Sequence, residues 1–550
     1  MVRALLVAVL FAAPVLAQLP APYRAYEEAL ARGDTGALER LLDEPGYVQI
    51  LAARALARSP GRPPARQLEL AERAARFDGA AGDWLLVGRL REVLGDAPGA
   101  AEAYGRALPE PEAEVALERL ARAGVREAYA ALYAGRAYEA LLALLPPQEV
   151  AWRARALYRL GRYEEALPAY RAWARREPAG RLGLAWTLFE LERYAEAAEA
   201  FAAAGGPEGA YGRGRALEAL GKPGAAMRAY LEARTPEALW RATALLERAG
   251  RTAEALPLYR ELARGGSRYA DDATLRLWVL ARRRGDAELE RWAYDRLEGG
   301  LAVLAGKPLE GVPRYQEGRY YAETLEGYLG LDRVTRLLTA GRMDWAWGAA
   351  RWWVQEVGAG RQPKKLRYLI GRRLEQYGRW DWALRIVPDR PETDFVPYWR
   401  VAYPRAYERE VLAAARAFGL EPELVWAVMR VESRFDPEAV SPTGARGLMQ
   451  FTAATWDEVA RRLGEEGADP FDPDAAVRFG TYYLRRLLDG CDRQLVCALT
   501  GYNGGPGYTR RALAEVGGDV WDFMRFQPRD EPREYVERVL RVYAVYQALY

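Results

Sequence analysis

The sequence predicts an all-α protein built from an N-terminal array of helical repeats and a C-terminal domain of shorter helices. From residue 20 to about 388, apolar residues recur at helical spacing and strand-like alternation is scarce. A short pattern also repeats along this region, as it does in solenoids. The pattern stops at a cluster of prolines between residues 388 and 404, and proline disfavours the interior of a helix. Glycine and turn signals then separate several short helical segments up to residue 550.

The repeat has three landmarks: a first position that is usually glycine, an Ala five residues later, and a large apolar residue nine residues after the first. The glycine ends one helix, the alanine lets neighbouring helices approach closely, and the large residue fills the gap between helix pairs. One helix pair cannot bury its own apolar face, so the copies are expected to stack. Residues 161–170 resemble the second half of a tetratricopeptide repeat, and looser copies extend to Gly341 and Gly378. The remaining first positions are Gly95, Gly135, Glu192, Gly221 and Gly250.

The aromatic residues of the repeats are expected to pack in the core. Tryptophans 345, 347, 352 and 353 could instead line a sugar-binding surface, but helical spacing explains most of them. The region is expected to serve as a curved scaffold that positions either a second domain or a long polymer.

Composition excludes several classes of chemistry. The 550 residues exceed what one core usually supports, and the net charge of +3 gives no strong signal for nucleic-acid binding. The absence of histidine excludes Ser-His-Asp and Cys-His nucleophile systems as well as His-based metal sites. Two cysteines are too few for a thiolate metal cage. Proton transfer therefore falls chiefly to Asp, Glu, Lys or Tyr, and no metal is expected.

Residues 1–17 are predicted to be a cleaved signal peptide. Arg3 precedes an apolar run over residues 4–16, and Ala17 ends a small-residue cleavage site. The alternative, an uncleaved membrane anchor, would need a longer run. Export to an oxidising compartment favours a disulfide between Cys491 and Cys497 over two unpaired thiols.

The stretch 421–435 is predicted to be a buried helix that carries a candidate general acid. Pro422 suits its first position, and Glu432 shares one face with Val425 and Val428. Burial and the negative end of the helix dipole would both raise the pKa of this carboxyl, as a general acid requires. The alternative is a solvated carboxylate, or one that pairs with a neighbouring arginine.

Four ordered motifs then point to a family. They occupy residues 432–435, 441–450, 501–507 and 531–536, and with them the chain resembles the soluble lytic transglycosylases, whose catalytic domain is similar to goose-type lysozyme. The resemblance covers residues from about 405 to 550. It implies a lysozyme-like α domain, here at 405–550, and before it a helical superhelix, here at 18–388, that forms either a closed ring or an open arc. The proline cluster places the linker between them at 389–404.

The resemblance also implies roles for individual residues. Glu432 would be the sole catalytic acid/base, and Tyr535 would orient its carboxyl. The remaining motif positions are expected to contact substrate: Ser433, Met449, Gln450, Thr455, Tyr502, Asn503 and Glu531. The sequence departs from the family pattern at Ala453, Gly501 and Ala476, where Pro, Ala and Asn are usual, but none of these changes removes a proton-transfer group.

The activity implied is cleavage of the β-1,4 bond between N-acetylmuramic acid and N-acetylglucosamine, with a 1,6-anhydro product and no cofactor. The expected location is the periplasm or cell envelope of a bacterium, and the expected partner is the peptidoglycan glycan strand, not nucleic acid. The alternatives are a lysozyme-like hydrolase and a repeat scaffold that binds glycan without cutting it. Recruitment of cell-wall proteins by the repeats is compatible with either enzyme.

Overall fold

A computed structural model describes residues 18–307, 312, 329–357, 363–391, 395–527 and 530–550. The predicted signal peptide, residues 1–17, lies outside the described residues, as do residues 392–394 of the expected linker. Among the described residues, regular structure is helical, and β structure is limited to two isolated bridges, Val440 with Arg446 and Arg446 with Phe451. The all-α prediction is confirmed. No described helix is both long and apolar enough to cross a membrane.

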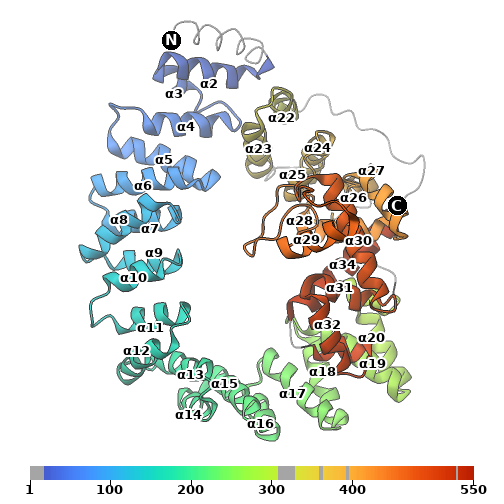
Figure 1. The fold of residues 1–550 in the computed structure, drawn as a ribbon. Helices are drawn as coiled ribbons and strands as arrows, with labels where there is room; N and C mark the ends of the chain where they lie inside the picture. Colours follow the sequence, from blue (N-terminus) through green and yellow to red (C-terminus); the bar gives the residue numbers. More distant parts are fainter. Residues whose placement is uncertain (1–17, 308–311, 313–328, 358–362, 392–394, 528–529) are drawn as a thin grey trace. The chain divides into compact units, whose positions relative to one another are not determined.

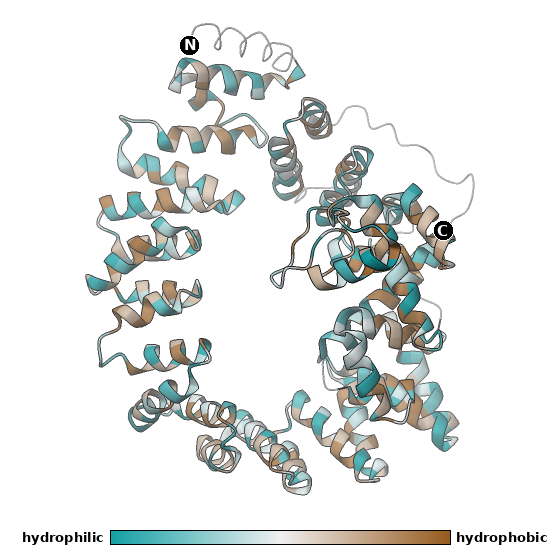
Figure 2. Ribbon diagram, viewed as in Figure 1, coloured by the Kyte–Doolittle hydropathy of each residue, from teal (hydrophilic) through white to brown (hydrophobic). Residues whose placement is uncertain are grey.

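The chain forms two compact units, and the first comprises residues up to 245 together with 327–359. Figure 1 shows its successive helices stacked on one another, and Figure 2 shows that they combine hydrophilic and hydrophobic residues. Its helices are α2 (Ala21–Arg32), α3 (Thr35–Arg40), α4 (Val48–Arg58), α5 (Pro64–Asp78), α6 (Ala81–Val93), α7 (Ala97–Ala107), α8 (Pro111–Arg122), α9 (Arg126–Ala134), α10 (Tyr138–Leu144), α11 (Val150–Arg159), α12 (Tyr163–Arg176), α13 (Gly180–Glu190), α14 (Tyr194–Ala204), α15 (Gly206–Ala219), α16 (Pro223–Ala233), α22 (Leu329–Thr339), α23 (Met343–Trp352) and the π-helix η1 (Trp353–Val357).

The repeat pattern has the structural basis expected from the sequence, with one correction. Gly161 lies between α11 and α12 and has a φ of 73°. This left-handed conformation is less strained for glycine than for other residues. Five and nine residues later, Ala166 and Tyr170 are buried. The copy assigned to Gly135, Ala140 and Leu144 is wrong by one residue.

At this copy the residue with positive φ is Arg136, at 64°, whereas Gly135 has a φ of −77°. The buried positions are accordingly Leu141 and Leu145, five and nine residues after Arg136. The repeat pattern predicts the left-handed conformation at Gly135, but Arg136 adopts it here.

Helices α22 and α23 pack against the first helices of the chain, within the same unit. The ring of Trp345 contacts those of Tyr23 and Tyr26, and Arg342 forms an ion pair with Glu27. The indole rings of tryptophans 352 and 353 contact each other, and both residues are buried. The packing role expected for these aromatic residues is confirmed for tryptophans 345, 352 and 353.

The second unit comprises residues 246–326 and 360–550. α17 (Pro236–Arg248) crosses from the first unit into it. The other helices are α18 (Thr252–Arg264), α19 (Ala270–Arg284), α20 (Ala287–Arg296), α21 (Gly299–Leu304), α24 (Pro363–Gln376), α25 (Trp380–Ile386), α26 (Val396–Ala402), α27 (Glu408–Phe418), α28 (Pro422–Ser433), α29 (Ala453–Leu463), α30 (Pro473–Asp489), α31 (Leu495–Gly504), α32 (Pro506–Ala514), α33 (Val520–Phe526) and α34 (Asp530–Leu549). Residues 405–550 lie wholly within this unit. The domain limits expected from the sequence stay a prediction.

Helix α34 is the central element around the candidate site. It packs against α28, α31 and α21, and Tyr546 on it stacks with the buried Trp426 of α28. A buried charge network also connects α33 to the repeat helices of this unit. In it, the Arg276 guanidinium of α19 pairs with both Glu247 and Asp522. The contacts of α34 with α28, α31 and α21 fix its position on several sides.

Candidate active site

Glu432 lies in the last turn of α28. The helix ends because Arg434 and Phe435 both adopt positive φ, at 53° and 65°. Ser433 stabilises this turn, since its Oγ donates to the Met429 carbonyl at 3.2 Å and accepts from the Phe435 N–H at 3.1 Å. Ser433 is buried, so its part in the site is to support the turn that carries Glu432.

A tyrosine from α34 binds the carboxyl of Glu432. The hydroxyl of Tyr535 donates to Glu432 Oε1 at 2.6 Å, and the Tyr535 side chain is almost wholly buried. The ring of Tyr502, from α31, stacks on that of Tyr535 with an interplanar angle of 4°. The packing of α28 and α31 against α34 thus brings together three residues that are far apart in the sequence.

Burial controls the protonation of this site. It raises the pKa of Glu432 to about 7, against the opposing effects of the Tyr535 hydrogen bond and the positive charge of Arg538, while the negative charge of Glu531 adds to the increase. The pKa values of Tyr502 and Tyr535 are also raised, mainly by burial, so both hydroxyls stay protonated. Near neutral pH, Glu432 can therefore both donate and accept a proton.

Arg538 was not predicted from the sequence. It lies three residues after Tyr535, so it shares a face of α34 with that residue, and this spacing was the one available signal.

The second motif forms a tight loop beside this carboxyl. Tyr502 donates from its hydroxyl to the Met449 carbonyl at 3.0 Å, whereas the Met449 side chain is buried against Gly480. Gln450 has a φ of 50°, and its Nε2 donates to the carbonyls of Ala439 and Gly447. Through Tyr502, the loop is connected to the pair formed by Glu432 and Tyr535.

The other residues expected to contact substrate lie farther along these elements. Thr455 is half-buried in the first turn of α29, with its hydroxyl 3.1 Å from that of Thr452. Asn503 is half-buried in the last turn of α31, and Glu531 is exposed at the start of α34. Among the described residues, no hydrogen bond joins any of these three side chains to Glu432.

A second carboxylate near the candidate acid, that of Asp436, already has other interaction partners. Asp436 accepts from the backbone N–H of Glu438 and lies 3.6 Å from Arg385.

No group of three or more His, Cys, Asp or Glu residues in the described part of the chain could hold a metal ion. Cys491 and Cys497 form a disulfide across the connection between α30 and α31.

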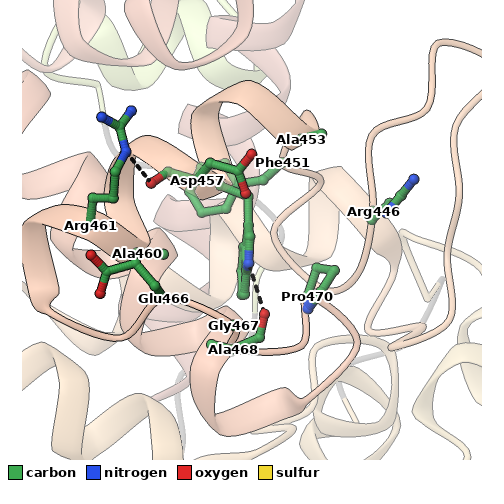
Figure 3. A pocket seen from close by; sticks show the side chains of 11 residues that line it. Arg446, Phe451, Ala453, Asp457, Ala460, Arg461, Glu466, Gly467, Ala468 and Pro470 are labelled. Atoms are coloured by element: carbon green, nitrogen blue, oxygen red, sulfur yellow. Dashed lines mark hydrogen bonds between the residues drawn. The ribbon is translucent and has the colours of Figure 1, made fainter.

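A pocket of about 490 Å³ lies next to the second motif, between α29 and the loop of residues 464–470 (Figure 3). Phe451 and Trp456 form part of its wall, together with charged side chains at its rim. Glu432, Gln450, Tyr502 and Tyr535 are not among its lining residues.

Comparison with known proteins places this geometry in context. Residues 410–519 match the family model of the transglycosylase SLT domain, which confirms the resemblance of these residues inferred from the motifs. The membrane-bound lytic murein transglycosylase C of Shigella sonnei is 31% identical over 205 residues, which cover 33% of this chain. The matched region spans 56% of the length of that relative, so only part of the relative is represented.

Two solved structures share the fold over most of the chain. One is an inactive mutant of the lytic transglycosylase Slt from Pseudomonas aeruginosa, with a TM-score of 0.60 and 21% identity, covering 96% of this chain and 91% of that one. The other is a 70-kDa soluble lytic transglycosylase in complex with bulgecin A, with a TM-score of 0.59, 17% identity and the same coverage.

Proposed function

We propose that the chain is an exported lytic transglycosylase that cleaves peptidoglycan glycan strands, on the basis of the match between residues 410–519 and the transglycosylase SLT domain. The observation that carries the proposal is the half-buried carboxyl of Glu432, which the Tyr535 hydroxyl binds at 2.6 Å and whose pKa burial raises to about 7. A carboxylic acid with this pKa can protonate a leaving group and then act as a base at neutral pH.

The proposed reaction uses one protein carboxyl. Glycosidases usually employ two, and the nearby Asp436 is held by a backbone N–H and lies close to Arg385. Glu432 would protonate the glycosidic oxygen between N-acetylmuramic acid and N-acetylglucosamine, and the acetamido group of the former would stabilise the cationic centre. The Glu432 carboxylate would then accept the proton of that sugar's 6-hydroxyl as its oxygen bonds to the anomeric carbon.

The product would be a 1,6-anhydro sugar, and water would not be consumed. Ring closure within one sugar is favoured over attack by bulk water because the reacting groups are already close together. Tyr535 would orient the acid, and Gln450, Thr455, Tyr502, Asn503 and Glu531 would contact the glycan. Met449, whose side chain is buried, would act through its carbonyl, which accepts from the Tyr502 hydroxyl. Ser433 would act through the turn that it stabilises. The repeats would hold the catalytic domain or the polymer, and they could also recruit cell-wall proteins.

Mass spectrometry of fragments released from purified peptidoglycan tests this proposal. The intact protein should release fragments with anhydro ends, and Glu432→Gln should release none. Glu438→Gln is a matched control, because Glu438 is exposed and lies on the loop after the same helix. Reducing ends would indicate a lysozyme-like hydrolase, and the absence of release by the intact protein would favour a glycan-binding scaffold.

A further inference from the structure

Helix α28 ends beside a segment that lies outside the matched family domain. Asp389 belongs to this segment, between α25 and α26, whereas the match to the transglycosylase SLT domain begins at residue 410. The backbone carbonyl of Asp389 accepts from the hydroxyl of Tyr403 at 2.8 Å, and Tyr403 is buried. This hydrogen bond fixes the point from which the Asp389 side chain reaches α28, and it does not depend on the charge of that side chain.

The Asp389 carboxylate binds two arginines that flank Glu432. Arg430, two residues before Glu432, donates from Nη2 to Asp389 Oδ1 at 2.9 Å. Arg434, two residues after Glu432, has its Nη2 3.7 Å from Asp389 Oδ2. Burial opposes the ionisation of this carboxyl, but the positive charges of Arg430, Arg434 and Arg541 lower its pKa. Asp389 is therefore ionised throughout the pH range in which Glu432 titrates.

Arg430 connects this carboxylate to the core around α28. Its side chain is buried, its Nε and Nη2 donate to the Ala402 carbonyl at 3.2 and 3.1 Å, and its guanidinium lies 4.3 Å from the centre of the Tyr403 ring. A buried charge is tolerated when hydrogen bonds and an opposite charge compensate the loss of water. Asp389 supplies that opposite charge, so its carboxylate stabilises the buried guanidinium two residues before Glu432.

The chain after Glu432 also contacts the segment around α25. Arg385, in the last turn of α25, lies 3.6 Å from Asp436. Between Glu432 and Asp436 lies the turn in which residues 434–435 both adopt left-handed φ. Left-handed conformations are costly for residues other than glycine and persist where the surrounding structure holds them. The contacts of Asp389 and Arg385 hold this turn at both ends.

The groups that act on the Glu432 carboxyl, or that its charge acts on, come from α34 and α31: Tyr535, Arg538, Glu531 and Tyr502. Asp389 is not one of them, so its effect on Glu432 has to pass through the last turn of α28.

We propose that Asp389 is a positioning residue for the cleavage reaction. Through the two arginines it holds the last turn of α28, so that the Glu432 carboxyl stays buried against Tyr535. The catalytic unit thus extends beyond the matched family domain into the segment between α25 and α26. This inference rests on the function proposed above.

Steady-state kinetics of the full chain on soluble peptidoglycan fragments, measured as a function of pH, test the proposal. Asp389→Asn keeps the size of the side chain and the backbone bond to Tyr403 but removes the charge. Glu458→Gln is the matched control, because Glu458 also binds two arginines, Arg462 and Arg486, but lies on α29. Thermal unfolding would verify that all variants are folded.

Asp389→Asn should lower kcat about tenfold while KM changes by less than about twofold, because the acid is misplaced and substrate binding is not affected. The alkaline limb of the kcat profile should move to lower pH, since a more solvated Glu432 has a pKa nearer its ordinary value. Arg430→Lys should act in the same direction without changing the net charge, because an ammonium group lacks the fork that binds both Ala402 and Asp389. An unmoved limb in either variant, or the same losses in Glu458→Gln, would overturn the proposal.

A measurement without substrate separates this inference from the proposed function. In the otherwise unaltered chain, Glu432→Gln should raise Tm at pH 8, because burial disfavours the ionised carboxyl. When Asp389→Asn is also present, the same substitution should raise Tm by about half as much or less, because a more solvated carboxylate costs the fold less. An equal gain in both backgrounds would overturn the inference. Failure of the proposed function is a separate result, namely that the intact protein releases no fragments from peptidoglycan.

Discussion

Replacement of Glu432 by glutamine is expected to stabilise the protein at pH 8 while it abolishes activity. The pKa of this carboxyl is raised from 4.5 to about 7 because burial disfavours its ionised form. The folded protein therefore binds a proton that the unfolded chain has released, and stability falls as pH rises from about 4.5 to 7. One pKa unit corresponds to about 1.4 kcal/mol, so the ionised carboxyl costs the fold roughly 3 kcal/mol above pH 7.

Glutamine retains the size of the side chain and an oxygen that can accept from Tyr535, but it does not ionise. The gain in stability should be less than about 1 kcal/mol at pH 5 and should approach 3 kcal/mol at pH 8. For a unit of this size, that corresponds to an increase in Tm of roughly 6–12 °C at pH 8. Thermal unfolding followed by circular dichroism at both pH values measures the difference.

The matched control is again Glu438→Gln, whose exposed side chain should leave Tm almost unchanged at either pH. A Tm difference for Glu432→Gln that is the same at pH 5 and pH 8 would refute the argument that burial controls this carboxyl. A decrease in Tm at pH 8 would refute it as well.

Three further changes probe the site and its support. Tyr535→Phe removes the hydrogen bond that lowers the pKa of Glu432, so the alkaline limb of the kcat/KM profile should move to higher pH while the maximum falls about tenfold or more; a limb that does not move would contradict this. Gly447→Ala should lower the free energy of unfolding by roughly 2 kcal/mol or more, because φ is 71° and a Cβ would lie 2.0 Å from the Pro470 carbonyl oxygen. The control Gly444→Ala, at φ 84° with no atom within 4 Å, should cost about 1 kcal/mol in chemical denaturation, and equal losses would show that the contact is irrelevant. Reduction of the disulfide at Cys491 should cost about 2 kcal/mol, as expected for a short closed loop, and an unchanged Tm in reductant would exclude this contribution.

The sequence was most informative for features that depend on a local residue pattern. Helical periodicity predicted the all-α fold, and the repeat frame predicted buried positions such as Ala166 and Tyr170. It failed at Gly135, because glycine is only the commonest residue in the left-handed position, and Arg136 adopts that conformation instead. The sequence preference for glycine does not by itself determine which residue ends a helix. Here the buried positions are Leu141 and Leu145, and they match a helix that begins after Arg136.

Features formed by distant segments were harder to predict. The residue pattern identified Glu432 and Tyr535, but the hydrogen bond between them depends on the packing of α28 against α34. The electrostatic effect of Arg538 depends on the same packing. The pocket near Arg446 arises because the 464–470 loop is fixed to Trp456, and no periodicity in the sequence reports that contact.

The most direct test of the central claim is digestion of purified peptidoglycan in water labelled with heavy oxygen, followed by mass spectrometry of the released ends. If Glu432 activates the sugar's own 6-hydroxyl, the intact protein will release anhydro ends without the label, and Glu432→Gln will release none. Labelled reducing ends from the intact protein, or continued release by Glu432→Gln, would contradict the account.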